Sequence, residues 1–439
     1  MLPTQISAHF KARRDALMKA HPGAAFLLPA AEEVLRNPDV HFPFRQESNF
    51  FYLTGFEEPE SFLVLSPRSN GPGHETILFV RRKDPEREMW EGERYGVDGA
   101  KQVFGADRSY PIHELEAKLP ELLKGASEVY YRYGLNERID RRVQVGLEAH
   151  LRSMGRSGKA LPPLRDPNEA IGEMRLFKSP AEIERLRKAC QITALAHKTA
   201  MKETRPGMNE FEVEALIDYS FRKNGCQRVG YGSIVAGGAN AACLHYRFNN
   251  QPLRDGDLLL IDAGGEHDYY TSDITRTFPV GRKFSGAQAK VYSLVLEAQK
   301  SAIGMARPGA KLPEIHRHVC EVLTDGLLSL GLLKGAREDL MKSAGFKRFY
   351  PHNTSHWLGM DVHDVGLYLK NGDPRPLEAG MCFTIEPGFY VQPADREAPR
   401  EYHGIGIRIE DDILVTSAGC EILTKDAPKE IADIEALRA

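Results

Sequence analysis

The spacing of apolar residues in the N-terminal part of the chain predicts strands that alternate with helices. The runs FFYLTGF (50–56), SFLVLSP (61–67) and ETILFVRR (75–82) predict strands, and AAFLLPAAEE (24–33) is a further short apolar run. Between 112 and 126, IHELEAKLPELLKGA carries its apolar residues at helical spacing. This alternation predicts an α/β domain.

A change of composition marks the end of that domain. Residues 154–168, MGRSGKALPPLRDPN, are rich in glycine, proline and basic residues, which is typical of a linker. A chain of 439 residues is also too long for one ordinary core. We therefore predict an N-terminal α/β domain over residues 1–170 and a second domain over residues 171–439.

The second domain repeats one helical plan. Ser179 and Pro180, with Glu182 in the first turn, signal the start of a long amphipathic helix. That helix ends near the tripeptide RPG at 205–207, and a second helix follows. A helix, RPG at 307–309 and another helix then recur. The recurrence indicates an internal duplication.

The strands of this domain are duplicated as well. LRDGDLLLIDAG (253–264) and LEAGMCFTIEPG (377–388) each read as a turn followed by a strand with a carboxylate at its end. When the two segments are overlaid, Asp262 falls on Glu386. A single acid in such a place is more often structural or solvated, but two acids at the ends of apolar strands, in duplicate, favour a functional centre.

Each copy is followed by a second strand that carries another acid. These acids are Asp273 in TSDITRTF and Glu410 in GIGIRIEDD. We expect two αβ halves, packed about a pseudo-two-fold axis around a curved antiparallel sheet, to bring all four carboxylates to one centre. Four crowded carboxylates repel each other and are costly to desolvate, and two divalent cations would remove that problem.

The chemistry of this acidic set favours metal-assisted hydrolysis. Two adjacent cations are typical of sites that activate a water molecule. Oxygen-rich ligands favour Mn, Fe, Co or Mg over a structural zinc, which prefers Cys and His.

Histidines and an arginine accompany the acids. HNTSHWLGMDVHDVG (352–366) contains His352, His356 and His363, and His245 lies upstream of Asp262. A lone histidine is usually structural or exposed, but three within one short segment could supply a metal ligand and groups that polarise a substrate. Strand alternation places Arg408 beside Glu410, where it could orient a ligand or form an ordinary salt bridge.

Composition and charge limit the classes of binding partner that the sequence predicts. The chain is 42% hydrophobic and 27% charged, with a formal net charge of −3, which gives no electrostatic reason to expect nucleic acid or membrane as a partner. The N-terminus lacks the apolar region of a signal peptide, and no apolar window is long enough to span a membrane. The six scattered cysteines are typical of reduced thiols. We therefore predict a cytoplasmic protein.

Several segments resemble the pita-bread metallopeptidases, the M24 group, which includes methionine aminopeptidase, prolidase, aminopeptidase P and creatinase. The segments that carry the resemblance are IDAG, SDITRTF, SHWLGMDVHD, TIEPG and GIGIRIEDD, together with RQESNFFYLTGFEEPES and EMRLFKSPAEIERLRKA, which resemble the aminopeptidase P branch. The resemblance runs from about residue 5 to residue 430. One departure is that Asn353, followed by Thr354, replaces the glycine usual after the first histidine of the metal loop.

The resemblance implies a ligand set for two divalent metal ions per chain, with Mn²⁺ as the predicted ion. The implied ligands are Asp262, Asp273, His356, Glu386 and Glu410. Asp273 and Glu410 would bridge both ions, and Glu386 would also shuttle a proton.

The resemblance further implies roles around the ligands. His245 and His363 would hydrogen-bond the substrate or the developing oxyanion, and His352 would line the pocket. Arg408 would support the ligands. The residues that would shape a proline pocket are Tyr390 and Trp90, and the segment of Trp90 would reach a neighbouring subunit's site.

The implied fold is a creatinase-like α/β domain, serving oligomerisation and substrate access, followed by a pita-bread catalytic domain. The implied activity is that of an Xaa-Pro aminopeptidase, acting on peptides as a homotetramer. Alternatives are a prolidase, which takes only Xaa-Pro dipeptides, and a non-catalytic pita-bread module that binds peptides. Creatinase-like enzymes and inactive modules tend to lose ligands, and all five are present here.

Overall fold

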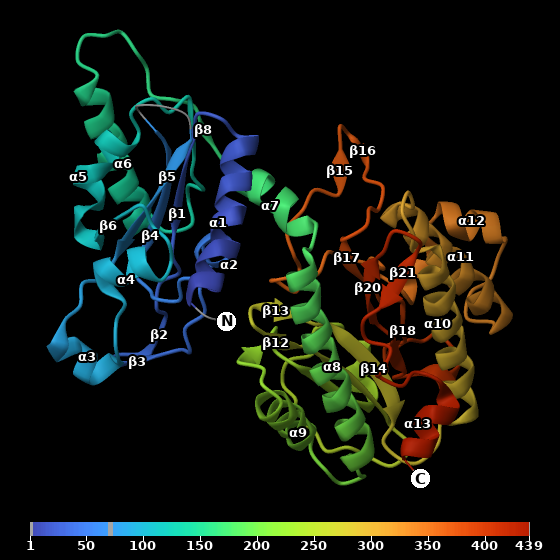
Figure 1. Cartoon of the computed structure of the whole chain (residues 1–439). Coiled ribbons are helices and arrows are strands. Elements are labelled where there is room, and N and C mark those ends of the chain that lie inside the picture. Colours follow the sequence, from blue (N-terminus) through green and yellow to red (C-terminus); the bar gives the residue numbers. More distant parts are fainter. Residues whose placement is uncertain (1–2, 69–72, 439) are drawn as a thin grey trace. The chain divides into compact units, whose positions relative to one another are not determined.

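The chain divides into two compact units, residues 1–174 and 175–439, in the computed structural model, which describes residues 3–68 and 73–438 (Figure 1). The helix α7 (Asn168–Leu176) runs across the boundary between the two units.

The first unit is built on one mixed six-stranded sheet. Its strands are β1 (Ala24–Pro29), β4 (Phe62–Pro67), β5 (His74–Val80), β6 (Arg108–Pro111), β7 (Glu128–Tyr130) and β8 (Leu164–Arg165). The order is β6-β5-β4-β1-β7-β8. Strand β4 runs antiparallel to β1 and β5, whereas the other neighbouring pairs are parallel. A separate hairpin consists of β2 (Leu35–Asn37) and β3 (Val40–His41).

Helices cover both faces of this sheet. The helices of this unit are α1 (Pro3–Ala20), α2 (Ser48–Thr54), α3 (Pro85–Glu91), α4 (Gly96–Gln102), α5 (Leu115–Leu122) and α6 (Glu137–Ser153), with the 3₁₀ turn η1 (Ile112–Glu114) before α5. Leu27 and Val64 of the sheet share one apolar core with Leu119 and Val143 of α5 and α6, while α1 and α2 lie on the opposite side (Figure 1). The α/β class predicted from the sequence is confirmed.

Two details of the first unit differ from the sequence prediction. FFYLTGF (50–56) lies largely in the helix α2 rather than in a strand. The Glu47 carboxylate accepts the Phe50 N–H at 2.7 Å and so caps the helix start, and Gly55 ends it with a φ of 67°. A short apolar run buried on most sides has no periodicity that separates strand from helix. Inside the predicted linker, residues 164–165 form the edge strand β8.

The first half of the second unit pairs two helices with a short antiparallel sheet. The helices are α8 (Pro180–Glu203) and α9 (Glu210–Lys223), and η2 (Gly238–Ala242) is a 3₁₀ turn. The main sheet contains β10 (Ile234–Gly237), β11 (Leu258–Ala263) and β14 (Ile274–Pro279), in that order. A smaller sheet contains β9 (Arg228–Val229), β12 (Gly265–His267) and β13 (Tyr270–Thr271).

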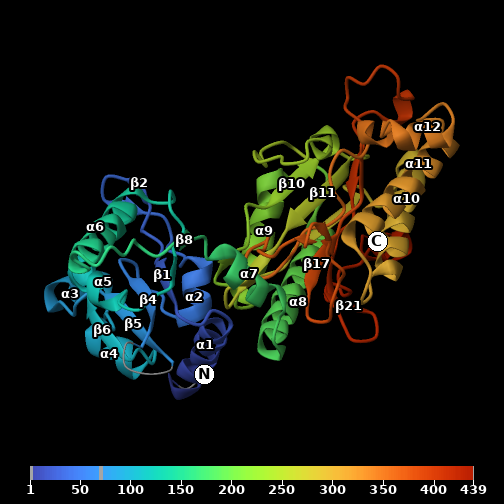
Figure 2. The same ribbon diagram turned by 90° about the horizontal axis from the view of Figure 1, so that it is seen from above.

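The second half follows the same plan. Its helices are α10 (Gly286–Met305), α11 (Leu312–Ser329), α12 (Arg337–Lys342) and α13 (Ile431–Leu437), with 3₁₀ turns η3 (Gly345–Arg348) and η4 (Arg400–Tyr402). Its strands are β15 (Leu369–Lys370), β16 (Asp373–Pro374), β17 (Cys382–Ile385), β18 (Gly388–Tyr390), β19 (Gly406–Arg408), β20 (Asp411–Val415) and β21 (Cys420–Ile422). Figure 2 shows the strands of both halves between the pair α8 and α9 and the pair α10 and α11.

Equivalent hydrogen bonds confirm the duplication. The Gly207 N–H donates to the Leu253 carbonyl at 2.8 Å, and the Gly309 N–H donates to the Leu377 carbonyl at 2.9 Å. These are the two RPG glycines and the first residues of the two overlaid strand motifs. The halves join where the Glu410 N–H donates to the Thr275 carbonyl at 3.1 Å. The acids that follow the motifs therefore lie at the junction.

Candidate metal centre

The four predicted acids and His356 come from five different segments that meet at this junction. Asp262 is near the end of β11, Asp273 precedes β14, Glu386 follows β17, and Glu410 stands between β19 and β20. Ligand atoms of Asp273, His356 and Glu410 lie within 4.8 Å of one another. The Nε2 atom of His356 is 3.4 Å from Asp273 Oδ2 and 3.5 Å from Glu386 Oε1.

His356 is held beside Glu386 because its loop runs along β17 like an added strand. The Glu386 N–H donates to the Thr354 carbonyl at 2.9 Å, and the Thr384 N–H donates to the His356 carbonyl at 3.0 Å. The Leu358 N–H continues this ladder to the Cys382 carbonyl. The chain can therefore bring the histidine to the acids without a regular strand of its own.

Burial and mutual repulsion dominate the electrostatics of the acids. Burial, and then the charges of Asp273, Glu386 and Asp262, raise the pKa of Glu410 well above its ordinary value. Burial, helped by Asp273 and Asp262 and opposed by His356 and Arg408, raises the pKa of Glu386 to about 7, and burial next to Asp262 raises the pKa of Asp273. Crowded carboxylates of this kind demand positive charge.

His356 supplies part of this positive charge when its imidazole is protonated. Burial alone would lower its pKa, but the hydrogen bond to Asp273 and the charge of Glu386 outweigh burial and raise the pKa to about 9. The position between two carboxylates that favours a proton on Nε2 is also the position of a metal ion. Four clustered carboxylates and one imidazole are donors suited to hard or borderline divalent ions, so the residues present fit such a group.

Arg408 is the buried cation of the centre, and its partner is Asp262 rather than its strand neighbour Glu410. The Nη2 atom donates to Asp262 Oδ2 at 2.5 Å, and Nη1 donates to the Tyr390 hydroxyl at 3.0 Å. His352 Nε2 is 2.9 Å from the same hydroxyl, and its Nδ1 donates to the Asn353 carbonyl at 2.8 Å. Burial and Arg408 lower the pKa of His352 to about 3, so this imidazole is neutral and accepts the Tyr390 proton.

The centre forms the floor of a cavity of about 1110 Å³. His245 and His363 line its wall, and the ring of His363 stands edge-on to that of His356 at 4.4 Å between centroids. Burial and the neighbouring His356 lower the pKa of His363. Ten of the eleven predicted residues thus belong to one region of the second unit. Trp90 belongs to the first unit, on α3, where it is 83% exposed.

Three contacts to the acids were missed by the sequence reasoning. The Tyr231 hydroxyl lies between Asp262 Oδ1, at 2.6 Å, and Asp273 Oδ1. The Thr275 hydroxyl donates to Glu410 Oε2 at 2.7 Å. The Thr275 contact could have been found from strand alternation, since Thr275 shares a face with Asp273. Tyr231 lies in a loop without periodicity, and nothing in the sequence marks it.

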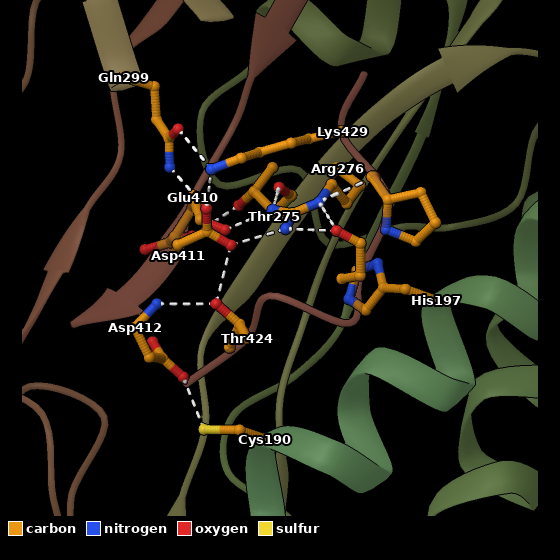
Figure 3. Close-up of polar contacts among 12 residues, drawn as sticks. Cys190, His197, Thr275, Arg276, Gln299, Glu410, Asp411, Asp412, Thr424 and Lys429 are labelled. Atoms are coloured by element: carbon orange, nitrogen blue, oxygen red, sulfur yellow. Dashed lines mark hydrogen bonds and ion pairs between the residues drawn. The ribbon is translucent and has the colours of Figure 1, made fainter. Parts of the chain in front are cut away.

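Behind the ligand strands lies a second buried polar cluster (Figure 3). The Asp411 carboxylate accepts from Arg276 at 2.6 Å, from Lys429 at 2.6 Å and from Gln299 at 2.7 Å. The guanidinium of Arg276 also donates to the backbone carbonyls of Thr275 and Glu410. This cluster fixes the backbone of both ligand strands from the side opposite to the cavity.

Comparison with known proteins places this architecture in a family. Residues 184–417 match the metallopeptidase family M24, and residues 10–130 match the N-terminal domain of aminopeptidase P. The chain belongs to the metallopeptidase family M24, with an N-terminal domain of the aminopeptidase P type.

Similar proteins cover the chain almost end to end. An Xaa-Pro aminopeptidase from Escherichia coli is 44% identical over 98% of this chain and 97% of its own length, and Xaa-Pro aminopeptidase 3 from Mus musculus is 38% identical over 92% of this chain and 79% of its own length. Among solved structures, an aminopeptidase from Pseudomonas aeruginosa is 46% identical, and zinc-substituted E. coli aminopeptidase P in complex with product is 44% identical. Each of these structures has a TM-score of 0.94 and 98% coverage of both chains. Among the described residues, no helix has the length and apolarity to cross a membrane.

Proposed function

We propose that this chain is a metal-dependent aminopeptidase that removes the N-terminal residue from peptides whose second residue is proline. The observation that carries the proposal is the cluster of four carboxylates and His356 that line one large cavity. It occurs in a chain that is 44% identical to an Xaa-Pro aminopeptidase over nearly its whole length.

Two divalent ions per chain are the cofactor that this cluster supports best, with Mn²⁺ as the proposed ion. The residues that would hold them are Asp262, Asp273, His356, Glu386 and Glu410. When bound, such ions lower the pKa of a water molecule and stabilise negative charge on a substrate oxygen.

Glu386 is the proposed proton carrier. Its carboxylate lines the cavity, with Oε1 3.5 Å from His356 Nε2, and a carboxylate in this place can act first as a general base and then as a general acid. It would take a proton from the attacking water and deliver it to the proline nitrogen that leaves. The Thr354 carbonyl fixes its backbone, and Thr384 Oγ1 donates to its Oε1 at 3.4 Å.

The histidines of the cavity have two proposed roles: two donate hydrogen bonds to the peptide, and one holds another side chain in place. His245 and His363 line the cavity and are the proposed hydrogen-bond donors to the peptide around the scissile bond. Both nitrogens of His352 are engaged by the protein, through Tyr390 and Asn353, so His352 lines the pocket and holds the Tyr390 hydroxyl.

The preference for proline would come from a subsite that accepts its rigid ring, together with a mechanism that does not need the scissile N–H, which proline lacks. Tyr390 and Trp90 are the proposed walls of the proline subsite.

Trp90 is exposed on α3, and so are Val34, Leu35 and Phe42 in and next to the β2–β3 hairpin of the same unit. Exposed apolar side chains of this kind support a homotetramer in which the first unit makes much of the contact, with Trp90 beside a neighbouring subunit's site. A cytoplasmic location remains part of the proposal.

One assay tests the activity. Protein loaded with Mn²⁺ is incubated with Xaa-Pro, Xaa-Pro-Yaa and Xaa-Ala-Yaa peptides, and the products are measured by mass spectrometry. We expect cleavage of Xaa-Pro-Yaa and sparing of Xaa-Ala-Yaa. Cleavage of Xaa-Pro alone would identify a prolidase, and binding without cleavage would identify a non-catalytic module. Light scattering tests the assembly against the monomer mass of 49.1 kDa.

A further inference from the structure

A buried polar chain runs behind the metal loop and takes no part in the mechanism above. Thr354 Oγ1 is 2.8 Å from the Tyr350 hydroxyl and 2.8 Å from His316 Nδ1. Thr354 and Tyr350 are each only 1% exposed. His316 lies on α11, lines the cavity, and has its Nε2 3.5 Å from the Cys320 sulfur.

The three side chains can be assigned as donors and acceptors of their hydrogen bonds. Burial raises the pKa of Tyr350 well above its ordinary value, so the phenol keeps its proton. Either oxygen of this pair could donate; we assign Tyr350 as the donor, because among the described residues Thr354 Oγ1 is the hydrogen-bond partner of its hydroxyl and a buried O–H needs an acceptor. With this assignment the Thr354 hydroxyl donates to His316 Nδ1, and the hydrogen of the neutral His316 ring is on Nε2. Burial, and then Lys347, lower the pKa of His316, in agreement with a neutral ring.

The hydrogen-bonded set of Tyr350, Thr354 and His316 contacts two of the proposed catalytic groups. The ring of Tyr350 packs edge-on against the ring of His352, with centroids 4.8 Å apart at 71°. The backbone carbonyl of Thr354 accepts the Glu386 N–H at 2.9 Å. Thr354 is therefore the residue at which the support of His352 and the support of Glu386 meet.

We propose that Thr354 is a positioning residue, whose hydroxyl, held between Tyr350 and His316, fixes the loop that orients His352 and Glu386. It follows the Asn353 that replaces the usual glycine, but Asn353 is exposed, whereas Thr354 is buried. Without the hydroxyl, the buried Tyr350 proton has no acceptor, and the ring must turn or admit water. Either change loosens the packing on His352 and the anchor of Glu386. The inference rests on the proposed aminopeptidase function for its kinetic readout only.

The test compares Thr354→Val, which keeps the shape and loses the hydroxyl, with Thr354→Ser, which keeps the hydroxyl. For Thr354→Val we expect kcat to fall by about 10-fold or more, the range in which partners of metal-site residues act. We expect KM and metal content to stay within about twofold of wild type, because Thr354 is not a proposed ligand and valine keeps its volume where it lines the cavity. Thr354→Ser should keep kcat within about threefold. A serine variant as impaired as the valine variant, or a valine variant with wild-type kcat, would overturn the proposal.

Two further variants separate positioning from general damage to the fold. Thr324→Val removes another buried hydroxyl on α11, which donates to the Cys320 carbonyl at 2.7 Å, and should leave kcat unchanged. Adding Tyr350→Phe to Thr354→Val removes the stranded donor and should restore much of the lost kcat, since deleting both partners of a buried hydrogen bond costs less than deleting one. A Thr324→Val enzyme as slow as Thr354→Val, or a double variant slower than Thr354→Val, would contradict the positioning role.

A crystal structure of metal-loaded Thr354→Val tests the same inference without any assay. We expect the His352 imidazole to be displaced from its wild-type position against Tyr390. If wild type itself cleaves no peptide, the proposed function fails, whereas an unmoved His352 and Glu386 in the variant structure overturn the positioning role alone.

Discussion

Glu410 and Asp411 are neighbours in the chain, both are deeply buried, and their electrostatics are opposite. The carboxyl of Glu410 faces the cavity, where burial and three other carboxylates raise its pKa well above the ordinary value. The carboxyl of Asp411 faces the other way, into the cluster of Figure 3. Burial alone would raise its pKa as well, but Arg276 and Lys429 outweigh burial and lower it.

The difference lies in which cations the protein provides. Behind the strands, Asp411 has two cationic partners of its own, and Gln299 and Thr424 complete its hydrogen bonds. In front, four carboxylates share Arg408, which is committed to Asp262 and Tyr390, and the imidazole of His356. A buried charge without a partner is costly, so the front of the strands is stable as an ionised set only with added positive charge. The back is a structural ion cluster, and the front is a binding site.

Removing one acid from the front should have the largest effect on activity. Glu410→Ala deletes a proposed bridging ligand, and we expect the protein to lose one or both metal ions and on the order of 10³-fold in kcat, the upper end of the roughly 10²–10³ that follows loss of a single oxyanion donor. Elemental analysis and a peptide assay measure the two effects, and the fold should remain. Two full equivalents of metal in this variant would refute the ligand assignment.

Removing the acid behind the strands should instead destabilise the fold. Asp411→Asn leaves Arg276 and Lys429 buried without their counter-charge, and breaking a buried pair in this way costs about 3–5 kcal/mol. Urea unfolding measures the cost, and the fraction that folds should still bind its metal. Lys300→Met is the matched control, because Lys300 and Glu430 form an exposed pair at 2.9 Å that is worth at most about 1 kcal/mol. Equal losses in the two variants would contradict the comparison.

The pH dependence of stability should change sign when metal is removed. In protein stripped of metal by a chelator, Glu386 holds its proton to a pKa of about 7, against 4.5 for the unfolded chain. The folded state then binds more protons between these values, so stability falls as the pH rises through that window, by no more than about 3 kcal/mol at 1.36 kcal/mol per unit. His356, with a pKa raised from 6.5 to about 9, extends the fall to higher pH.

Metal-loaded protein should behave in the opposite way. Its carboxylates and imidazole must be deprotonated to bind the ions, so metal affinity and the stability that it adds grow with pH. Thermal unfolding at a series of pH values, with and without chelator, measures both slopes. Glu386→Gln should flatten the slope of the stripped protein. Parallel slopes for the two forms would argue against a metal site at the front.

The sequence predicted the acids that face the cavity far better than the residues that support them. Asp262 and Glu386 could be found because each ends an apolar strand after a turn glycine, Gly256 and Gly380, whose φ values of 86° and 92° show the same turn twice. Those signals are local and repeated. Supports such as Tyr231 and Thr354 depend on contacts between segments far apart in the chain, and no local pattern encodes such contacts.

The same limit explains the helix at α2. Its apolar residues are buried on most sides, so the run carries no period, and the evidence for a helix lies in the cap at Glu47 and the left-handed Gly55. The family resemblance supplied roles for His245, His352 and Arg408, but it did not predict that Arg408 pairs with Asp262. That pairing is set by how the two halves dock.

A smaller effect than that of Glu410→Ala is expected from a residue that faces the cavity but is not a proposed ligand. His363 lines the cavity beside His356, and we expect His363→Ala to lower kcat by roughly 10²-fold, as for loss of an oxyanion-type donor, with metal content near normal. The loss should appear in kcat more than in KM, because the contact acts mainly on the transition state. Steady-state kinetics with Xaa-Pro-Yaa and elemental analysis give the two readouts, with His318→Ala as a control, since His318 contacts Ser301 and is not part of the cavity wall. Full activity after His363→Ala would show that His363 does not contribute to catalysis beyond the five proposed metal ligands. Loss of metal would instead show that His363 is itself a metal ligand.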